Sequence, residues 1–204
     1  MLPHMTVINP CDFNQTKQAT IAIAKHEGPV YLRFGRPKVP IFIKDDMPFE
    51  IGKALRLVEG TDVSIFATGH LVWQAILAEE ILREKGVSAE IINIHTIKPL
   101  DEKAILDSVA KTGCAVSAEE HQVNGGLGDS VAQTLAMHNP LPLEYRRVRM
   151  KFAQLANYWA FTHHHLFILL KVRHRALQHE VFAFQTVLVC RPVKCVPKLI
   201  DSEG

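Results

Sequence analysis

Across the middle of the chain, short apolar runs alternate with amphipathic stretches, and this alternation constrains the fold more than any other feature. The run Asp62 to Thr68 ends at Gly69, and Leu71 to Lys85 then sets one apolar stripe against a charged face, before Gly86 ends the pattern. Strands and helices that alternate at this spacing form a doubly wound sheet with parallel strands. We therefore predict an α/β fold over residues 51–149.

The same alternation predicts the other elements of this segment. Asp101 can cap a helix that runs through Lys111, and a glycine-rich turn precedes a helix that ends at His138. The further predicted strands are Ala89 to Ile94, Cys114 to Ala118 and Leu143 to Val148. Because α/β sheets place their ligands at the carboxyl ends of the strands, the turns that follow these strands are candidate sites.

A separate strand–helix–strand unit precedes this segment. Residues 5–8 predict a strand, Asp12 or Asn14 can cap the helix that follows, and Val30 to Phe34 predicts a second strand. A β-α-β unit of about 35 residues is too small to bury a core alone. We therefore expect that the sequence starts inside a domain, or that this unit docks on something absent from the chain. The proline-containing stretch 38–50 shows no period and predicts a linker running over the surface.

The end of the chain differs from the rest. From about residue 150 the apolar pattern has no consistent period, and residues 146–204 contain 10 Lys/Arg and 3 Asp/Glu against 13 and 18 in the remainder. We expect an atypical tail over 150–204, either disordered or created by a frameshift that replaced the natural end. Its basic balance could attract nucleic acid, but no motif supports a nucleic-acid partner.

Composition excludes several classes of protein. A hydrophobic fraction of 48% and a charged fraction of 22% are typical of a globular chain. Apolar runs such as Leu166 to Leu170 are far shorter than the roughly 18 residues of a membrane span, and the first residues lack the pattern of a secretory signal. The four cysteines show neither metal-site spacing nor a disulfide framework, so we expect reduced thiols and a cytoplasmic location.

The most distinctive polar stretch is Glu119-Glu120-His121 followed by the glycine-rich residues 125–128. Amide groups at a helix N-terminus could bind an anion there. The structural alternative is that the glycines permit close packing while the acids cap the helix, and we favour this alternative. His70 is interpreted as a neighbour of a helix cap, and a metal site at His163 to His165 is ranked low because no acidic or thiol partner is suitably spaced.

Two arginines lie at the end of the second predicted strand. Arg33 is expected inside the strand, on its exposed face. Arg36 follows a strand end and a glycine, and a guanidinium there is suited to bidentate binding of a phosphate. By position alone, we favour the interpretation of Arg36 as a solvated surface arginine over that of a phosphate ligand.

About three quarters of the chain resembles the transketolase-type thiamine diphosphate enzymes, and the bacterial split transketolases most of all. The carrying segments are Gly-Pro-Val-Tyr-Leu-Arg-Phe-Gly-Arg-Pro at 28–37, Ile-Phe-Ala-Thr-Gly-His at 65–70, Ile-Asn-Ile-His-Thr-Ile-Lys-Pro-Leu-Asp at 92–101, and Glu-Glu-His-Gln-Val-Asn-Gly-Gly-Leu-Gly-Asp-Ser-Val-Ala at 119–132. The resemblance implies a remnant of a pyrimidine-binding domain over 1–37, the linker 38–50, and a C-terminal domain over 51–149. The family's usual ending is missing from Arg146 onward.

The resemblance also implies a function. Such enzymes move two-carbon ketol units between sugar phosphates, as in the pentose phosphate pathway, and use thiamine diphosphate with a divalent metal such as Mg²⁺. Their catalytic and cofactor-binding residues lie upstream of the position that matches Met1, so we expect none on this chain, and no activity alone. The one substrate contact that transfers is a phosphate-binding arginine, which matches Arg36. The implied partner is an N-terminal transketolase subunit or a homodimer mate, with no membrane partner.

Two rival functions remain open from the sequence. The chain could be a fragment of 1-deoxyxylulose-5-phosphate synthase or of a 2-oxo acid dehydrogenase β chain. The synthase shares an arginine at the position of Arg36, whereas the dehydrogenase β chains usually lack it. The other rival is a non-enzymatic docking module, which would be a stable monomer instead of a fragment with exposed apolar surface.

Overall fold

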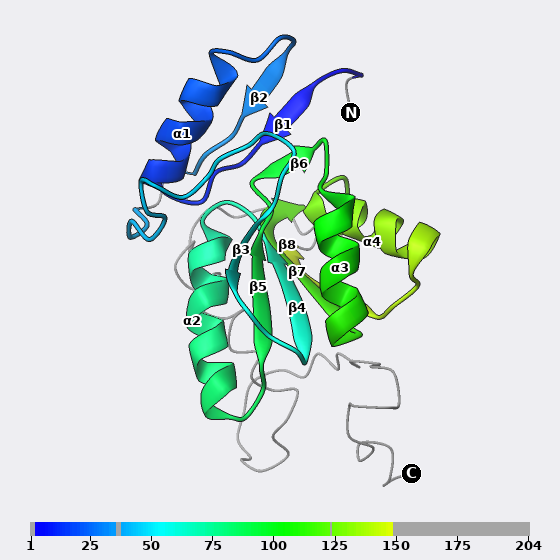
Figure 1. Cartoon of the computed structure of the whole chain (residues 1–204). Coiled ribbons are helices and arrows are strands. Elements are labelled where there is room, and N and C mark those ends of the chain that lie inside the picture. The colour runs from blue at the N-terminus through cyan, green and yellow to red at the C-terminus, as the bar shows by residue number, and fades with distance from the viewer. Residues whose placement is uncertain (1–2, 36–37, 123, 149–204) are drawn as a thin grey trace, which may run out of the picture.

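Two sheets, one small and one large, make up the fold of the computed structural model, which describes residues 3–35, 38–122 and 124–148 (Figure 1). The small sheet has the order β2-β1-β6 and the large sheet the order β3-β5-β4-β7-β8. The strands are β1 (Thr6–Ile8), β2 (Val30–Leu32), β3 (Leu55–Val58), β4 (Val63–Ala67), β5 (Ala89–Asn93), β6 (Thr96–Lys98), β7 (Ala115–Gln122) and β8 (Leu143–Val148). The tail and its three adjacent histidines lie outside the described residues, as does Arg36.

The predicted β-α-β unit is present at the N-terminus. Strands β1 and β2 pair in parallel, with Thr6 opposite Val30, and α1 (Phe13–Ile23) connects them. Of the two predicted caps, Asp12 is the one used: its Oδ1 accepts a hydrogen bond from Gln15 N at 2.9 Å. This β-α-β unit is called the N-terminal unit below, and residues 51–148 are called the C-terminal domain.

The large sheet is parallel except at one edge. Strands β5, β4, β7 and β8 run parallel, as predicted. Two short strands were not predicted from the sequence: β3, which pairs antiparallel with β5 at the edge, and β6, which pairs antiparallel with β1. Strand β6 thereby brings a piece of the C-terminal domain into the small sheet.

Helices cover both faces of the large sheet (Figure 1). Helix α2 (Leu71–Glu84) packs on one face, and α3 (Glu102–Thr112) and α4 (Leu127–His138) pack on the other. Each face has its own apolar core, and successive residues of β4 point into different cores: Ile65 toward α2 and Phe66 toward α3 and α4. None of the helices in the described ranges is long and apolar enough to cross a membrane.

The predicted helix ends are confirmed in the C-terminal domain. Asp101 caps α3, since its Oδ1 accepts from Ala104 N at 3.1 Å, and its Oδ2 accepts from Ala54 N at 2.9 Å. Gly86 follows α2 with φ +74°, the left-handed conformation that glycine adopts without strain. Helix α1 is shorter than expected and ends at Ile23, ahead of the Gly28-Pro29 stop.

The expectation that residues 38–50 run over the surface is wrong at Ile43, which is only 1% exposed. The backbone N–H groups of Phe42 and Ile43 both donate to Asp12 Oδ2, at 2.9 and 2.8 Å. The Phe42 ring lies 5.5 Å from the ring of Trp73 on α2. This segment therefore packs between the N-terminal unit and α2.

Candidate functional site

The carboxyl ends of β4 and β7 form the switch point of the large sheet. These neighbouring strands are paired, with Ala67 opposite Ala118, but the chain leaves β4 toward α2 on one face and leaves β7 toward α4 on the other. In open α/β sheets the crevice between two such diverging connections is where ligands bind. His70 and Glu120 lie at the two sides of this point.

Arg33 of the N-terminal unit reaches this switch point. Its Nη2 donates a hydrogen bond to the backbone carbonyl of Glu120 at 2.7 Å and lies 3.7 Å from Glu120 Oε2. The Nε2 atom of His70 lies 3.5 Å from the same carboxylate oxygen. A guanidinium from another part of the chain thus occupies the place where a ligand of the C-terminal domain would be expected.

The electrostatics of this group follow from its partial burial. Burial and the nearby Arg33 charge lower the pKa of His70 to about 4, so its imidazole is neutral at neutral pH. Burial raises the pKa of Glu120, and Arg33 opposes this rise. Arg33 is therefore the cation that compensates the half-buried carboxylate.

The prediction for Arg33 was wrong, and His70, predicted as a neighbour of the helix cap, is the cap residue itself. Strand β2 ends at Leu32, so Arg33 lies beyond the strand and its alternating faces, and its side chain is only about one-third exposed. His70 is the N-cap residue of α2, without a side-chain capping bond. No local signal in the sequence reveals that Arg33 contacts a strand 87 positions later.

The glycine-rich turn before α4 binds a side chain of its own domain. Glu119 accepts hydrogen bonds from Leu127 N at 2.7 Å and from Gly128 N at 2.9 Å. Asp129 Oδ2 accepts from Gly125 N at 2.6 Å. Because these amide groups already have carboxylate partners, the structural interpretation of the turn is confirmed over the anion-binding one.

Asn9 joins the N-terminal unit to the same edge of the large sheet. Its carbonyl accepts from Gly69 N and from Thr68 Oγ1, both at 3.3 Å, and its own N–H donates to the His95 carbonyl at 2.8 Å. Gly69 has φ +58°, and a Cβ atom there would lie 2.8 Å from the Asn9 side chain. Glycine is required at 69 both by its backbone conformation and by this close approach.

A buried polar group lies between the N-terminal unit and β5 of the large sheet. Asn93 Nδ2 lies 3.2 Å from Cys11 Sγ and donates to Gln15 Oε1 at 3.1 Å, and Gln15 Oε1 also accepts from Cys11 N at 2.9 Å. Burial and the adjacent Asp12 raise the pKa of the Cys11 thiol, so it stays protonated. Cys11 therefore acts as a packing residue and not as a nucleophile.

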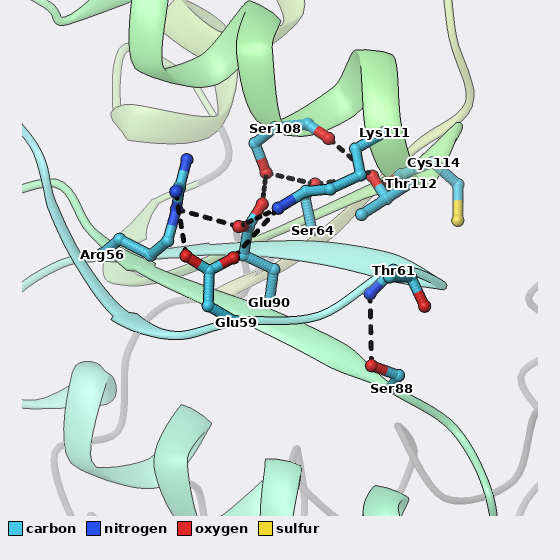
Figure 2. Close-up of polar contacts among 10 residues, drawn as sticks. All are labelled: Arg56, Glu59, Thr61, Ser64, Ser88, Glu90, Ser108, Lys111, Thr112 and Cys114. Atoms are coloured by element: carbon cyan, nitrogen blue, oxygen red, sulfur yellow. Dashed lines mark hydrogen bonds and ion pairs between the residues drawn. The ribbon is translucent and has the colours of Figure 1, made fainter.

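A second polar cluster lies at the opposite edge of the sheet, around Glu90 at the amino end of β5 (Figure 2). Glu90 is fully buried, and its carboxylate contacts Arg56 Nε at 2.9 Å and Lys111 Nζ at 2.6 Å. It also accepts from the Ser108 hydroxyl, which begins a chain of hydroxyl groups through Ser64 to Thr112. All these contacts join β3, β4, β5 and α3, so we interpret the cluster as structural.

The described residues contain no group of three or more His, Cys, Asp or Glu side chains arranged to hold a metal ion. The phosphate-binding role predicted for Arg36 stays a prediction, because that residue is outside the described ranges.

The fold and its switch point define an α/β domain whose carboxyl edge contacts the N-terminal unit through Arg33 and Asn9. The transketolase C-terminal domain model matches residues 52–169. The chain belongs to this family, and the match runs past residue 149, where we expected the family pattern to have ended.

Similar proteins include two transketolase subunits and a synthase. The chain is 46% identical over 155 residues to a 6-deoxy-6-sulfo-D-fructose transketolase subunit of Clostridium sp. (strain MSTE9), covering 76% of this chain and 48% of that protein. It is 41% identical over 142 residues to an apulose-4-phosphate transketolase subunit of Phocaeicola vulgatus, covering 69% and 45%. A 1-deoxy-D-xylulose-5-phosphate synthase of Thermomicrobium roseum is 40% identical over 139 residues, covering 66% and 22%.

A solved structure titled as a split gene transketolase, inactive beta4 tetramer, has the same fold. It superimposes with a TM-score of 0.78 at 35% identity, covering 83% of this chain and 57% of that one. The chain spans about half the length of the transketolase subunits that it matches.

Proposed function

We propose that the chain is the C-terminal part of a transketolase-type enzyme that transfers two-carbon ketol units between sugar phosphates. In this proposal the chain is active only in an assembly with an N-terminal transketolase subunit, or with a homodimer mate that supplies the N-terminal half. The relatives named as transketolase subunits support this proposal, as does the half-length match to them.

The observation that carries the proposal is the concentration of exposed large apolar side chains in the N-terminal unit and the segment that follows it. Most of the large apolar side chains that are more than half exposed in the described residues precede residue 51: Phe13, Ile21, Tyr31, Phe34 and Ile41. Among the described strands, β2 is also an edge of the small sheet. Exposed apolar side chains and an edge strand favour burial against a partner, and in this proposal the polypeptide that supplies the N-terminal half is that partner.

In this proposal the partner, and not this chain, holds the cofactor of the reaction. The glycine-rich helix start of this chain, before α4, has its amide groups bound to Glu119, so those groups are not available as donors to a diphosphate. Thiamine diphosphate, held with Mg²⁺ by the partner, supplies the carbanion chemistry in this proposal. The contribution of this chain is to bind the phosphate of the sugar substrate through the guanidinium of Arg36.

The test is reconstitution. The chain is purified alone and with the N-terminal-half polypeptide, and ketol transfer from xylulose 5-phosphate to ribose 5-phosphate is measured with thiamine diphosphate and Mg²⁺. We expect activity only for the mixture, and a raised KM for the sugar phosphates in Arg36→Gln. The matched control is Arg83→Gln, since Arg83 is an exposed arginine on α2 that pairs only loosely with Glu79, at 3.6 Å. Ketol transfer by the chain alone, or a stable monomer that never binds the other half, would contradict the proposal.

The similarity to 1-deoxy-D-xylulose-5-phosphate synthases supports a second candidate activity. That reaction condenses pyruvate with glyceraldehyde 3-phosphate, and it too uses a phosphorylated substrate. The same reconstituted sample, supplied with these two compounds, separates the candidates, because the proposal predicts turnover of the sugar phosphate pair only.

A further inference from the structure

We infer that the edge of β2 that faces away from β1, called the free edge below, is the docking site for a strand of the polypeptide that supplies the N-terminal half of the enzyme. This inference rests on the proposed function and deepens it, because it names the part of this chain that the partner contacts. The partner strand extends the small sheet beyond β2 through main-chain hydrogen bonds.

The main-chain groups along β2 alternate in direction. Thr6 N donates to the Pro29 carbonyl at 2.9 Å, and Arg33 N donates to the last residue of β1 at 2.8 Å, so residues 29 and 33 face β1. Because the backbone N–H and C=O groups of successive strand residues point to opposite sides, those of Val30 and Leu32 point to the free edge. Among the described strands, none lies on that side of β2 (Figure 1).

Strand β2 differs from the other edge strands of the described residues because it contains no charged residue. Strands β3, β6 and β8 form the remaining edges of the two sheets, and they contain Arg56, Lys98 and Glu144 respectively. Charged residues on an edge strand oppose pairing with a further strand. The sequence of β2 is Val-Tyr-Leu, three residues that are favourable in a strand and offer no such opposition.

The residues that flank β2 leave the free edge accessible. Pro29 has no N–H group, but residue 29 faces β1, so this proline removes no donor from the free edge. The charge of Arg33 is directed elsewhere, since its side chain donates to the Glu120 carbonyl on the large sheet at 2.7 Å. The side chains of Tyr31 and Phe34 are 53% and 61% exposed, so they offer apolar surface to a strand that binds there.

The length of the relatives identifies the occupant. The chain covers 48% and 45% of two similar transketolase subunits, so about half of each subunit lies outside the match. The matched part includes the C-terminal domain of the family, over residues 52–169, and the unmatched part therefore lies mainly upstream. A segment that leads directly into β1 is held close to the neighbouring strand β2, which favours pairing at its free edge. We therefore assign this edge to the upstream segment and not to a second copy of the chain.

The first experiment measures binding of the full chain to the half of the 46% identical subunit that it does not match. Tyr31→Lys places a charge on β2 at a side chain that is exposed in the chain alone, and we expect it to weaken binding by about tenfold or more. Met137→Lys is the matched control, since Met137 is an exposed apolar residue of α4, and it should bind like the wild type. Wild-type hydrogen exchange in α3 shows that both variants are folded. Equal binding of Tyr31→Lys and the wild type would overturn the inference.

The second experiment needs no variant and follows single amides by hydrogen exchange and NMR. The amides of Val30 and Leu32 should exchange rapidly in the chain alone and at least about tenfold more slowly in the complex, because they gain partners only there. The amides of Tyr31 and Arg33, which face β1, should be protected in both states. A complex that leaves Val30 and Leu32 unprotected shows that the partner binds elsewhere, and the inference is then wrong.

Ketol transfer by the assembly completed with an N-terminal transketolase subunit separates the possible failures. An assembly that is active, and that binds Tyr31→Lys like the wild type, overturns the inference and leaves the proposed function standing. Binding through β2 without ketol transfer overturns the proposed function and supports the docking site. A dimer of the chain alone that Tyr31→Lys dissociates, without binding of the upstream half, assigns the free edge to a second copy and overturns the inference. Absence of binding by the wild-type chain also overturns it.

Discussion

The carboxylate of Glu119 lies directly against Gly126, so that a Cβ atom added at 126 would lie 2.1 Å from Glu119 Oε2. The same carboxylate holds the first amide groups of α4, at residues 127 and 128. The capping of α4 by Glu119 therefore requires a residue without a side chain at 126. The backbone conformation does not require glycine there, because φ is −100°.

The first prediction is that Gly126→Ala destabilises the protein by about 1–3 kcal/mol, because the added methyl group must displace Glu119 or the turn. Urea unfolding followed by tryptophan fluorescence measures the change. Gly125→Ala serves for comparison: nothing lies within 4 Å of its Cβ position, but φ +82° is strained for alanine. Its cost should be about 1 kcal/mol. Equal stability of Gly126→Ala and wild type would show that the turn is looser than described.

The second prediction concerns the buried carboxylate of Glu90. Glu90→Gln should destabilise the protein by about 1.5–3 kcal/mol, since it leaves Arg56 and Lys111 without their buried partner and weakens the bond from Ser108. Glu59 contacts the same two cations but is 71% exposed. Glu59→Gln is therefore the control and should change the urea midpoint little. A larger effect of Glu59→Gln than of Glu90→Gln would contradict this interpretation of the cluster.

The third prediction is a loss of stability in mild acid. Burial lowers the pKa of both His70 and His95 to about 4, from an ordinary value near 6.5. The unfolded chain therefore binds more protons between these values, so the free energy of unfolding falls as pH drops from 6.5 toward 4. The slope is at most about 1.4 kcal/mol per pH unit for each histidine. Glu120 acts in the opposite direction above its ordinary pKa of 4.5, because its pKa is raised in the folded protein.

Thermal unfolding across this pH range provides the measurement. The double variant His70→Asn/His95→Asn should show a flatter profile than the wild type, even if it is less stable at neutral pH. An unchanged slope in the double variant would assign the acid sensitivity to other groups.

The fourth prediction is that Cys11 resists alkylation in the folded protein. This residue is 3% exposed, and burial raises the pKa of its thiol, so the reactive thiolate is scarce and sheltered. Iodoacetamide followed by peptide mass spectrometry should label Cys11 only when denaturant is added. Rapid labelling of Cys11 under native conditions would indicate that the N-terminal unit detaches from the large sheet.

The local parts of the fold could be predicted from the sequence. Asp12 and Asp101 are helix caps whose partners lie three residues away, so the signal is contained in a short window. The parallel strands were predicted for a similar reason, since short apolar runs that alternate with amphipathic helices have few other arrangements.

The parts that depend on distant pairing could not be predicted. Strands β3 and β6 are three or four residues long and are defined by their partners β5 and β1, not by a pattern of their own. Glu119 and Glu120 are adjacent in β7, and alternation places them on opposite sides. That Glu119 caps α4 while Glu120 meets Arg33 follows only from the packing of whole elements.

The antiparallel pairing of β1 with β6 has a consequence for any division of the gene. Strand β6 completes the small sheet from a position far downstream in the chain, so a break within residues 38–50 would deprive β1 of a neighbour encoded on the other product. In this architecture the linker between the two domains is therefore not a position at which the gene can be divided without separating paired strands. A separation upstream of β1 keeps both neighbours of that strand on a single product.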